Sequence, residues 1–276
     1  MNGLDTDPGV TRTFRQRKTT QMQADQAPFS VRLARTTEDL RAAQRLRYDV
    51  FVEELGGDGP LVDHTARLEK DHYDEIFDHL LLADEAQNGQ IVGVYRLLRD
   101  DQARAAGQFY SEDEYDLTAL KRSGRRLMEL GRSCLAQGYR GGTAMFHLWA
   151  GLAEYIARHE IEILFGVASF HGTDPRALAQ ALSLLHHRHL APEPLRVRAL
   201  EAYYQPMDLL PEDRIDRRAA MVQVPALIKA YLRLGGFVGD GAFVDHAFNT
   251  TDVCLVMDTK MLNERQKSIY SKGVER

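Results

Sequence analysis

The sequence predicts an α/β (α+β) fold formed by a single domain. Apolar, strand-like segments alternate along the chain with segments whose apolar residues recur at helical spacing. Hydrophobic side chains make up 44% of the 276 residues, and a chain of this length can bury one large core or two small ones. The alternation favours one α/β domain with additions, which we place at residues 29–260.

The predicted elements follow one another as strand, helix, hairpin, long strand, helix, strand, two helices and late strand. In chain order they cover approximately residues 29–33, 37–51, 80–84 with 91–98, 127–135, 145–156, 161–169, a helix opening at 174, 225–234 and 252–258. We interpret 100–126 and 190–222 as insertions. The polar tails 1–28 and 261–276 lie outside the domain, and the first is expected to be disordered.

Alternation, capping and turn residues identify the elements of the first half. Residues 29–33 alternate between apolar and polar side chains, which is the period of a strand. Thr36 or Thr37 supplies the hydroxyl that caps the next helix, whose apolar residues recur three or four positions apart. Asn88 and Gly89 favour the tight turn of the hairpin that follows.

In the second half a long strand is followed by alternating helices and strands. The segment 127–135 is mostly apolar, and the helix after it carries one apolar face. Asp174 and Pro175 are the cap and first-turn residues typical of a helix start. The helix at 225–234 is expected to end at the glycine pair that follows it.

Composition and charge exclude several classes of protein. The net charge of −5 argues against a general nucleic-acid binder. Cys134 and Cys254 lie in apolar runs and are interpreted as reduced core residues. No apolar run approaches the length of a membrane span, and the N-terminus lacks a signal peptide. We expect a cytoplasmic protein, with peripheral contact at the inner membrane left open. His186, His187 and His189 lie near one helix end, where neighbouring positions point to different faces, so we expect no metal site. We also expect no permanently bound cofactor.

Charged residues in the first half of the chain indicate a shared polar site. Arg47 precedes Phe51 by one helical turn, so it borders the face that packs inward, and a guanidinium there requires carboxylates. Asp71 and Asp74 are the natural suppliers. For Arg47 and Asp74, substrate binding and a structural salt-bridge network both stay open. Arg96 is embedded in an apolar strand, which favours a functional role.

The strand at 127–135 carries two ionisable residues whose spacing is informative. In a regular strand Glu129 and Arg132 would point to opposite faces, because three positions is an odd spacing. One extra residue at Gly131, a β-bulge, would turn both toward the same cleft, and glycine is the residue expected at such a distortion. The bulge would also free a backbone N–H to stabilise an oxyanion.

A glycine-rich turn separates that strand from the next helix. Such a turn lets the backbone approach a ligand closely, and the free N–H groups and positive dipole end of the helix attract phosphate. The residues of this predicted phosphate cradle are Gln137, Gly138, Tyr139, Arg140, Gly141 and Gly142.

The order of elements and this turn resemble the GNAT-like acyl-CoA N-acyltransferase fold, which implies a mixed central sheet flanked by helices. In that family the turn usually reads Gln or Arg, two residues, Gly, one residue, then Gly or Ala. Gln137 and Gly142 fit, whereas Arg140 stands at the middle glycine position. An arginine there suits the single phosphate of the phosphopantetheine arm of acyl carrier protein better than acetyl-CoA.

Four charged motifs, read in order, are similar to the pattern of acyl-homoserine-lactone synthases, which use acyl carrier protein as donor. They begin at Arg47, Glu69, Arg96 and Glu129. The C-terminal part looks like the bacterial ornithine N-acyltransferases that make lyso-ornithine lipid. The segments that carry this second resemblance are 169–175, 230–237 and 245–252.

The resemblance implies transfer of a 3-hydroxyacyl chain from acyl carrier protein to the α-amino group of L-ornithine. The amine must first lose a proton, and Glu129 is the candidate base, directly or through a water, with Glu69 or Asp71 as alternatives. Asp71 and Asp74 would hold the cationic amino acid, and an arginine its carboxylate. The predicted catalytic residues are Glu129, Gly131 and Asp71. The predicted substrate-binding residues are Arg47, Phe51, Glu69, Asp74, Arg96 and Arg132.

Donor docking is expected on basic residues just before the long strand, where an acidic carrier helix could land, with a solvated basic loop as the alternative. These residues are Lys121, Arg122, Arg125 and Arg126. The acyl chain is expected between the strands that splay beyond Gly131. Other readings stay open: acylation of another amino acid such as glutamine, a homoserine-lactone synthase acting on S-adenosylmethionine, and a non-catalytic carrier- or lipid-binding module.

Overall fold

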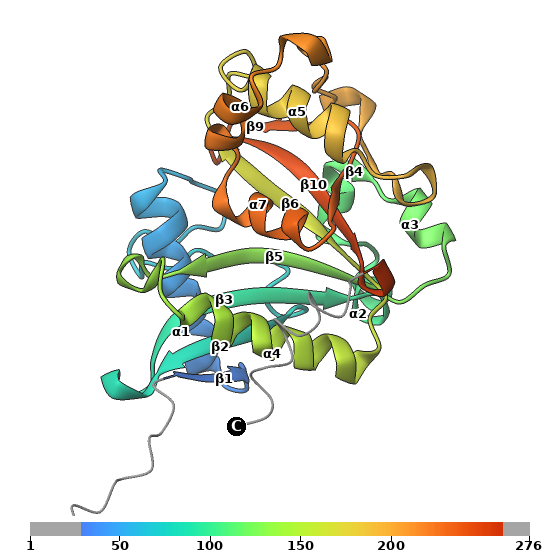
Figure 1. Cartoon of the computed structure of the whole chain (residues 1–276). Coiled ribbons are helices and arrows are strands. Elements are labelled where there is room, and N and C mark those ends of the chain that lie inside the picture. The colour runs from blue at the N-terminus through green and yellow to red at the C-terminus, as the bar shows by residue number, and fades with distance from the viewer. Residues whose placement is uncertain (1–28, 262–276) are drawn as a thin grey trace, which may run out of the picture.

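The computed structural model describes residues 29–261 (Figure 1). The tail predicted at 1–28, and the predicted C-terminal tail beyond Met261, lie outside the described residues. The strands are β1 (Phe29–Leu33), β2 (Asp78–Asp84), β3 (Gln90–Arg99), β4 (Tyr115–Asp116), β5 (Leu127–Leu135), β6 (Ile163–His171), β7 (Arg198–Ala199), β8 (Phe237–Val238), β9 (Phe243–Asp245) and β10 (Thr250–Asp258). The α-helices are α1 (Thr37–Arg47), α2 (Asp100–Ala106), α3 (Thr118–Arg122), α4 (Ala144–His159), α5 (Ala179–His189), α6 (Arg217–Gln223) and α7 (Ala226–Arg233).

The main sheet is mixed, as predicted. Its strands follow the order β1-β2-β3-β5-β6-β10-β8, with β9 also paired to β10. β5 and β6 run parallel, whereas β1-β2, β2-β3, β3-β5 and β6-β10 are antiparallel. β4 and β7 form a separate two-stranded sheet. The single parallel pair therefore lies at the centre of the main sheet.

Helices and irregular segments cover both faces of this sheet (Figure 1). Side chains alternate along β2, so that Leu81 packs with α1 on one face, whereas Leu80 and Leu82 belong to the core beneath α4 on the other. α7 shares the face of α4. The segment 100–126 covers the opposite face of β5, β6 and β10, through buried residues such as Phe109.

Most of the predicted elements are present. The Thr36 hydroxyl accepts from the Asp39 N–H and caps α1, and the hairpin turns at Asn88 and Gly89. Beyond α1 the chain continues as one stretch of π-helix, Tyr48–Glu54. No helix within 29–261 combines the length and the apolar character needed to cross a bilayer.

The structure corrects one prediction about local structure and adds detail to two others. The helix predicted to open at Asp174 begins at Ala179, because the backbone bonds of the preceding residues span three positions, as in Leu178 N–H to Pro175 O. The Asp174 carboxylate accepts from the Arg176 N–H at 2.9 Å at the start of these turns. The segment 100–126, interpreted as a polar insertion, contains α2, β4 and α3. The segment 190–222 likewise contains β7 and α6. The predicted domain boundaries stay a prediction.

The parallel pair β5-β6 is short, and it opens into a gap. The two strands pair from Leu127 opposite Ile163 to Glu129 opposite Phe165 and then diverge. At the point of divergence, a Cβ added to Gly166 would lie 2.1 Å from the carbonyl oxygen of Leu130. Glycine at this position therefore lets β6 pass close to the β5 backbone.

We expect Gly166→Ala to lower the free energy of unfolding by about 1–3 kcal/mol, because the clashing atom belongs to the backbone and cannot rotate away. Denaturant unfolding followed by circular dichroism measures the change. Gly138→Ala is the matched control, since a Cβ there meets no atom within 4 Å. Equal losses in the two variants would contradict this account of Gly166.

Candidate active site

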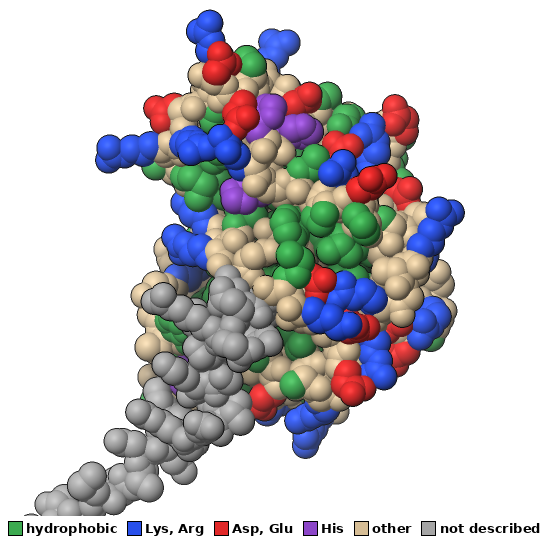
Figure 2. Space-filling model, turned by 45° about the vertical axis from the view of Figure 1, so that its right-hand side comes forward, with side chains coloured by type: hydrophobic (Ala, Val, Ile, Leu, Met, Phe, Trp, Pro, Cys, Tyr) green, Lys and Arg blue, Asp and Glu red, His purple; other side chains and the backbone are tan. Residues whose placement is uncertain are grey.

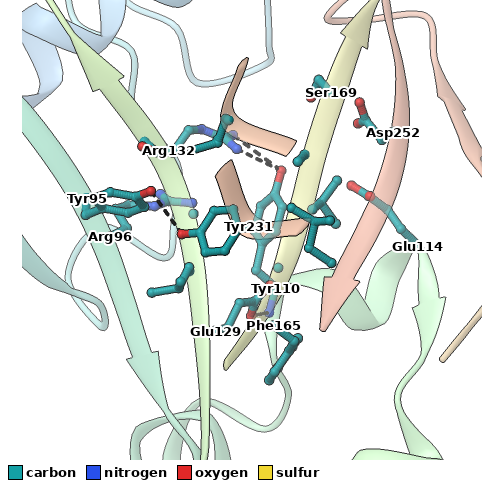
Figure 3. A pocket seen from close by; sticks show the side chains of 18 of the residues that line it. Tyr95, Arg96, Tyr110, Glu114, Glu129, Arg132, Phe165, Ser169, Tyr231 and Asp252 are labelled. Atoms are coloured by element: carbon teal, nitrogen blue, oxygen red, sulfur yellow. Dashed lines mark hydrogen bonds between the residues drawn. The ribbon is translucent and has the colours of Figure 1, made fainter. Parts of the chain in front are cut away.

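The divergence of β5 and β6 opens a cavity of about 270 Å³ (Figure 3). Most of its charged lining comes from residues on the sheet face covered by 100–126, or from that segment itself: Arg96, Glu114, Glu129, Arg132 and Asp252. Asp245 of β9 also lines it. Its apolar lining comes largely from the face covered by α7: Leu164, Ala168, Leu227, Tyr231, Leu255 and Met257. The cavity therefore joins a charged compartment to an apolar one through the gap in the sheet.

The predicted bulge in β5 is confirmed. Val94 of β3 pairs with Cys134 and Arg96 pairs with Gly131, so β5 holds two residues where β3 holds one. The left-handed residue is Arg132, with φ of 48°, and not Gly131. The bulge therefore changes the direction of Arg132, while Gly131 contributes its lack of a side chain.

Tyr110 connects the two ionisable residues that the bulge brings to one face. The backbone N–H of Tyr110 donates to the Glu129 carboxylate at 2.8 Å, and both terminal nitrogens of Arg132 donate to its hydroxyl at 3.3 Å. The Arg132 guanidinium also lies over the Tyr110 ring. Glu129 and Arg132 therefore line one cavity, as the odd spacing with a bulge predicted.

Gly131 borders the passage between the two compartments, and a Cβ added there meets no atom within 4 Å. We expect the series Gly131→Ala, Gly131→Val and Gly131→Leu to lower kcat/KM for the predicted acyl transfer progressively, by tenfold or more at Leu. The reason is that each larger side chain fills more of the passage. The free energy of unfolding should change by about 0.5 kcal/mol or less. Steady-state kinetics and thermal unfolding check the series, and equal activity in the Ala and Leu variants would contradict it.

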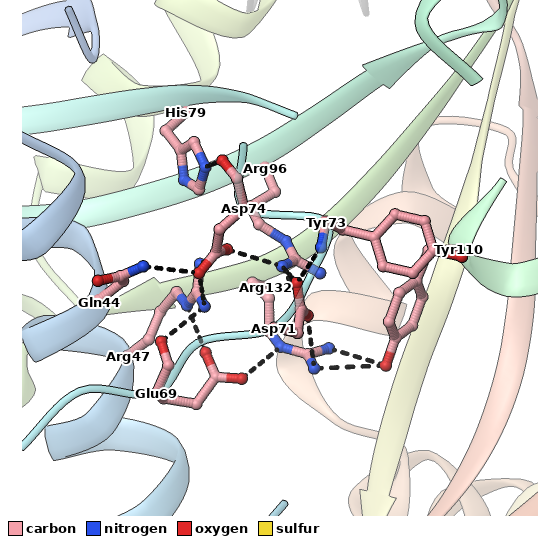
Figure 4. A network of polar contacts seen from close by, with 10 residues as sticks. All are labelled: Gln44, Arg47, Glu69, Asp71, Tyr73, Asp74, His79, Arg96, Tyr110 and Arg132. Atoms are coloured by element: carbon pink, nitrogen blue, oxygen red, sulfur yellow. Dashed lines mark hydrogen bonds and ion pairs between the residues drawn. The ribbon is translucent and has the colours of Figure 1, made fainter. Parts of the chain in front are cut away.

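Three arginines and three carboxylates form a polar network beside the cavity (Figure 4). Nε of Arg47 donates to the Glu69 carboxylate, and Nη1 donates to Asp74 Oδ1 at 2.6 Å. Nη1 of Arg96 donates to both oxygens of Asp71 at 2.7 Å and to Asp74 at 2.9 Å. Each arginine is thus held in a fixed direction by carboxylates from the irregular segment before β2.

Arg132 completes the network on its cavity side. Its Nε donates to Glu69 Oε1 at 3.1 Å, and its Nη2 lies 3.5 Å from Asp71 Oδ2. Burial alone would raise the pKa of Glu69, Asp71 and Asp74, but the arginines outweigh burial and the pKa of each carboxyl is lowered. These carboxylates stay ionised at neutral pH and are weak proton acceptors.

The predicted site residues separate into two groups around this network. Those that line the cavity are Phe51, Arg96, Glu129, Gly131 and Arg132. The others, which are absent from its lining among the described residues, are Arg47, Glu69, Asp71 and Asp74. Arg47 has no exposed surface and Glu69 is 1% exposed. Direct substrate contact by this second group stays a prediction, and the geometry gives it instead the role of holding Arg96 and Arg132.

Glu129 is the buried carboxyl at the junction of the two compartments. It is 2% exposed and accepts from the backbone N–H groups of Tyr110 and Ser111 at 2.8 Å and from the Ser111 hydroxyl. Burial raises the pKa of Glu129 to about 7, although these hydrogen bonds oppose the rise. A carboxyl with this pKa is partly ionised at neutral pH and can accept a proton there.

The glycine-rich turn follows β5 directly. Gln137–Tyr139 forms one turn of 3-10 helix, and Gly141 has φ of 76°, which favours glycine. Nε of Arg140 donates to the Leu135 carbonyl at 3.0 Å, and its Nη2 lies 2.7 Å from Glu54. The side chain of Arg140 is 44% exposed. Its contact with a phosphate stays a prediction.

The predicted carrier-docking residues lie at the other end of β5. A strand of this length spans roughly 25–30 Å, which separates them from the turn. Lys121 pairs with Glu112 and Arg126 with Glu160, and Arg125 pairs with Asp258. Docking through this cluster, Lys121, Arg122, Arg125 and Arg126, stays a prediction. The geometry does not favour it for an arm that enters at the turn.

The cavity also contains carboxyls that the sequence analysis did not select: Glu114, Asp245 and Asp252. Asp252 could have been identified from the sequence, because it is a charged residue in a mostly apolar strand, as Glu129 is in β5. No pattern in the sequence marks Glu114 or Tyr110 as a site residue, since both lie in the segment interpreted as an insertion.

Comparison with known proteins bears on the identity of this site. A family model described as Acetyltransferase (GNAT) domain matches residues 46–150, which include most of the polar network and β5. The L-ornithine N(alpha)-acyltransferase of Rhodobacter capsulatus is 58% identical over 258 residues, covering 92% of this chain and 99% of that protein. The chain belongs to the L-ornithine N(alpha)-acyltransferase family. The family member from Brucella abortus is 44% identical over 254 residues and covers 90% of each chain.

A solved structure agrees with the fold of this family member. FeeM, an N-acyl amino acid synthase from uncultured soil microbes, superimposes with a TM-score of 0.50 at 12% identity, covering 84% of this chain and 92% of that chain. At this identity the likeness shows the fold alone. Together with the domain match over residues 46–150, this likeness confirms the predicted GNAT-like fold. Membership of the L-ornithine N(alpha)-acyltransferase family makes the chain an acyltransferase.

Proposed function

We propose that this protein moves a 3-hydroxyacyl chain from the phosphopantetheine thioester of acyl carrier protein to the α-amino group of L-ornithine. The product is lyso-ornithine lipid. The observation that carries the proposal is one cavity that joins a charged compartment to an apolar one where β5 and β6 diverge. The names of the relatives support the acceptor, and the motifs shared with carrier-dependent synthases support the donor.

In this proposal Glu129 supplies the base. A free α-amino group has a pKa of about 8 and is mostly protonated at neutral pH, so Glu129 must first remove a proton, directly or through a water. The amine then attacks the thioester carbon: the C–N bond forms, the C–S bond breaks and the thiolate leaves. The second proton that the nitrogen loses on becoming an amide protonates the thiolate, which gives the free carrier thiol. Glu69 and Asp71 are less suited to this role, because the neighbouring arginines lower the pKa of both.

The other residues of the charged compartment position the reactants. Arg132 and Arg96 line the cavity and would hold the carboxylate of the amino acid. The backbone at Gly131 would face the thioester carbonyl as it becomes an oxyanion. The acyl chain would pass Gly131 into the apolar compartment under α7, while the turn at 137–142 would hold the phosphate of the donor arm.

We place the reaction in the cytoplasm, with peripheral contact to the inner membrane for release of an amphiphilic product. The test incubates purified protein with 3-hydroxyacyl carrier protein and separate acceptors: L-ornithine, L-lysine, L-glutamine and S-adenosylmethionine. Mass spectrometry should detect N-acyl ornithine and free carrier thiol. An acyl-homoserine lactone would indicate the signal synthase, carrier binding without turnover would indicate a binding module, and equal rates with acyl-CoA would overturn the choice of donor.

A further inference from the structure

Two carboxyl groups in the cavity, those of Glu114 and Asp252, form no ion pair with any residue in the range 29–261 that the structure describes. Glu114 directly follows the short helix Tyr110–Asp113 and is 8% exposed, and Asp252 in β10 is 5% exposed. Both side chains point into the cavity (Figure 3). Oε2 of Glu114 and Oδ1 of Asp252 are buried and accept no hydrogen bond from any described residue. Buried polar atoms of this kind are uncommon and need an explanation.

The contrast with the polar network on the other side of the cavity is informative. There, Glu69, Asp71 and Asp74 are matched by three arginines. Arg132 lowers the pKa of Glu114 and Asp252 through space, but its ion pairs are with Glu69 and Asp71 and not with these two carboxyls. The carboxyl groups of Glu114 and Asp252 therefore carry acceptor capacity that the described part of the protein leaves unused.

The surroundings of the two carboxyls agree with this view. Burial raises the pKa of Glu114 well above its usual range, and the nearby Asp252 and Asp245 raise it further. Burial likewise raises the pKa of Asp252 to about 6, opposed by the hydroxyls of Ser169 and Thr250. Burial disfavours the charged form of both carboxyls, and a cation bound between them would favour it.

We propose that Glu114 and Asp252 form the subsite that binds the side-chain ammonium of a dibasic amino acid acceptor. This inference rests on the proposed function and deepens it. The two carboxyls lie across the cavity from Arg132, with Glu129 at its floor (Figure 3). Arg132 thus takes the α-carboxylate, Glu129 faces the α-amine, and the Glu114–Asp252 pair takes the distal ammonium. The subsite selects against neutral amino acids, because a neutral side chain would leave both carboxyls unpaired.

The test measures acceptor choice in the full-length protein with 3-hydroxyacyl carrier protein. The acceptors are L-ornithine and L-2-aminopentanoate, which has the same carbon chain without the distal amine. Wild type should prefer ornithine in kcat/KM by about 100-fold or more, since a hydrogen bond to a charged group is worth about tenfold to 100-fold. Comparable rates for the two acceptors in wild type would overturn the subsite without any variant.

The variants are Glu114→Gln, Asp252→Asn and the double change. We expect each single change to raise KM for ornithine about 10- to 100-fold, with a smaller change in kcat, and to leave 2-aminopentanoate unaffected or improved. The temperature of thermal unfolding should change little, since each change keeps the size of the side chain and neither carboxyl pairs with a cation within residues 29–261. Asp240→Asn is the control, because that carboxylate pairs with Arg198 and Tyr204 away from the cavity. An unaltered preference for ornithine in the double variant would refute the subsite.

The outcomes for the subsite and for the proposed function are distinguishable. If wild type acylates ornithine and the double variant keeps its preference, the subsite is wrong and the proposed function stands. Suppose instead that wild type does not acylate ornithine but acylates L-lysine, and that the variants show a raised KM for L-lysine. The subsite then stands and the proposed acceptor is wrong. Calorimetry measures the binding of L-ornithine in the absence of the acyl donor. Binding of L-ornithine without any turnover would indicate that recognition of the donor has failed, and neither of the two cases above would apply.

Discussion

Replacing Glu129 by Gln is expected to lower kcat by roughly 10²–10⁴-fold, the usual contribution of a positioned general base. Glutamine keeps the size of the side chain. Its one amide oxygen can replace only one of the two carboxylate oxygens, which accept separately from the backbone N–H groups of Tyr110 and Ser111. What it loses is the capacity to take a proton. Single-turnover kinetics with preformed 3-hydroxyacyl carrier protein measure the chemical step directly.

The pH dependence gives the same residue a second signature. The base must be deprotonated to act, and the pKa of Glu129 is raised to about 7, so wild-type kcat/KM should fall about tenfold per pH unit below pH 7. The Glu129→Gln variant should lack this limb. An intact limb and a normal rate in that variant would move the role of base to Glu69 or Asp71.

Ser111→Ala is the matched control for this assignment. The Ser111 hydroxyl donates to the Glu129 carboxylate and lowers its pKa against burial. Its removal should therefore move the acidic limb to higher pH while leaving the rate at high pH largely intact. A limb that stays in place in Ser111→Ala would indicate that a different group titrates.

The part of the site on β5 could be predicted because two local rules conflict there. Glu129 and Arg132 stand an odd number of residues apart in one strand, and a glycine lies between them, so a shared face requires a bulge. That conflict is visible in nine residues of sequence. The register of β3 against β5 confirms it, although the left-handed residue is Arg132 and not the glycine.

The opposite wall of the cavity could not be predicted in the same way. Glu114 and Tyr110 belong to short turns within 100–126, where no periodic pattern indicates burial. Their position depends on tertiary packing of that segment over β5, β6 and β10. The sequence also could not decide between substrate and arginines as the partners of Asp71 and Asp74, because those pairs join residues more than twenty positions apart.

The second large effect concerns the polar network of three arginines and three carboxylates beside the cavity. Arg47→Met is expected to lower the free energy of unfolding by about 3–5 kcal/mol, the cost of leaving buried charges without their partner. Arg47 has no exposed surface and donates to Glu69 and Asp74, both nearly fully buried. Arg32→Met is the control: Arg32 is 42% exposed where it pairs with Asp39, and its loss should cost about 1 kcal/mol or less. Urea unfolding measures both.

The same variant decides between the two roles that the sequence left open for Arg47. A structural arginine predicts a large loss of stability, whereas a substrate-binding arginine predicts a stable protein with a raised KM for the amino acid. Because Glu69 also accepts from Nε of Arg132, loss of Arg47 should in addition loosen Arg132. Any kinetic defect that survives in folded Arg47→Met protein should therefore resemble that of Arg132→Met, and additivity of the two changes would argue against a shared network.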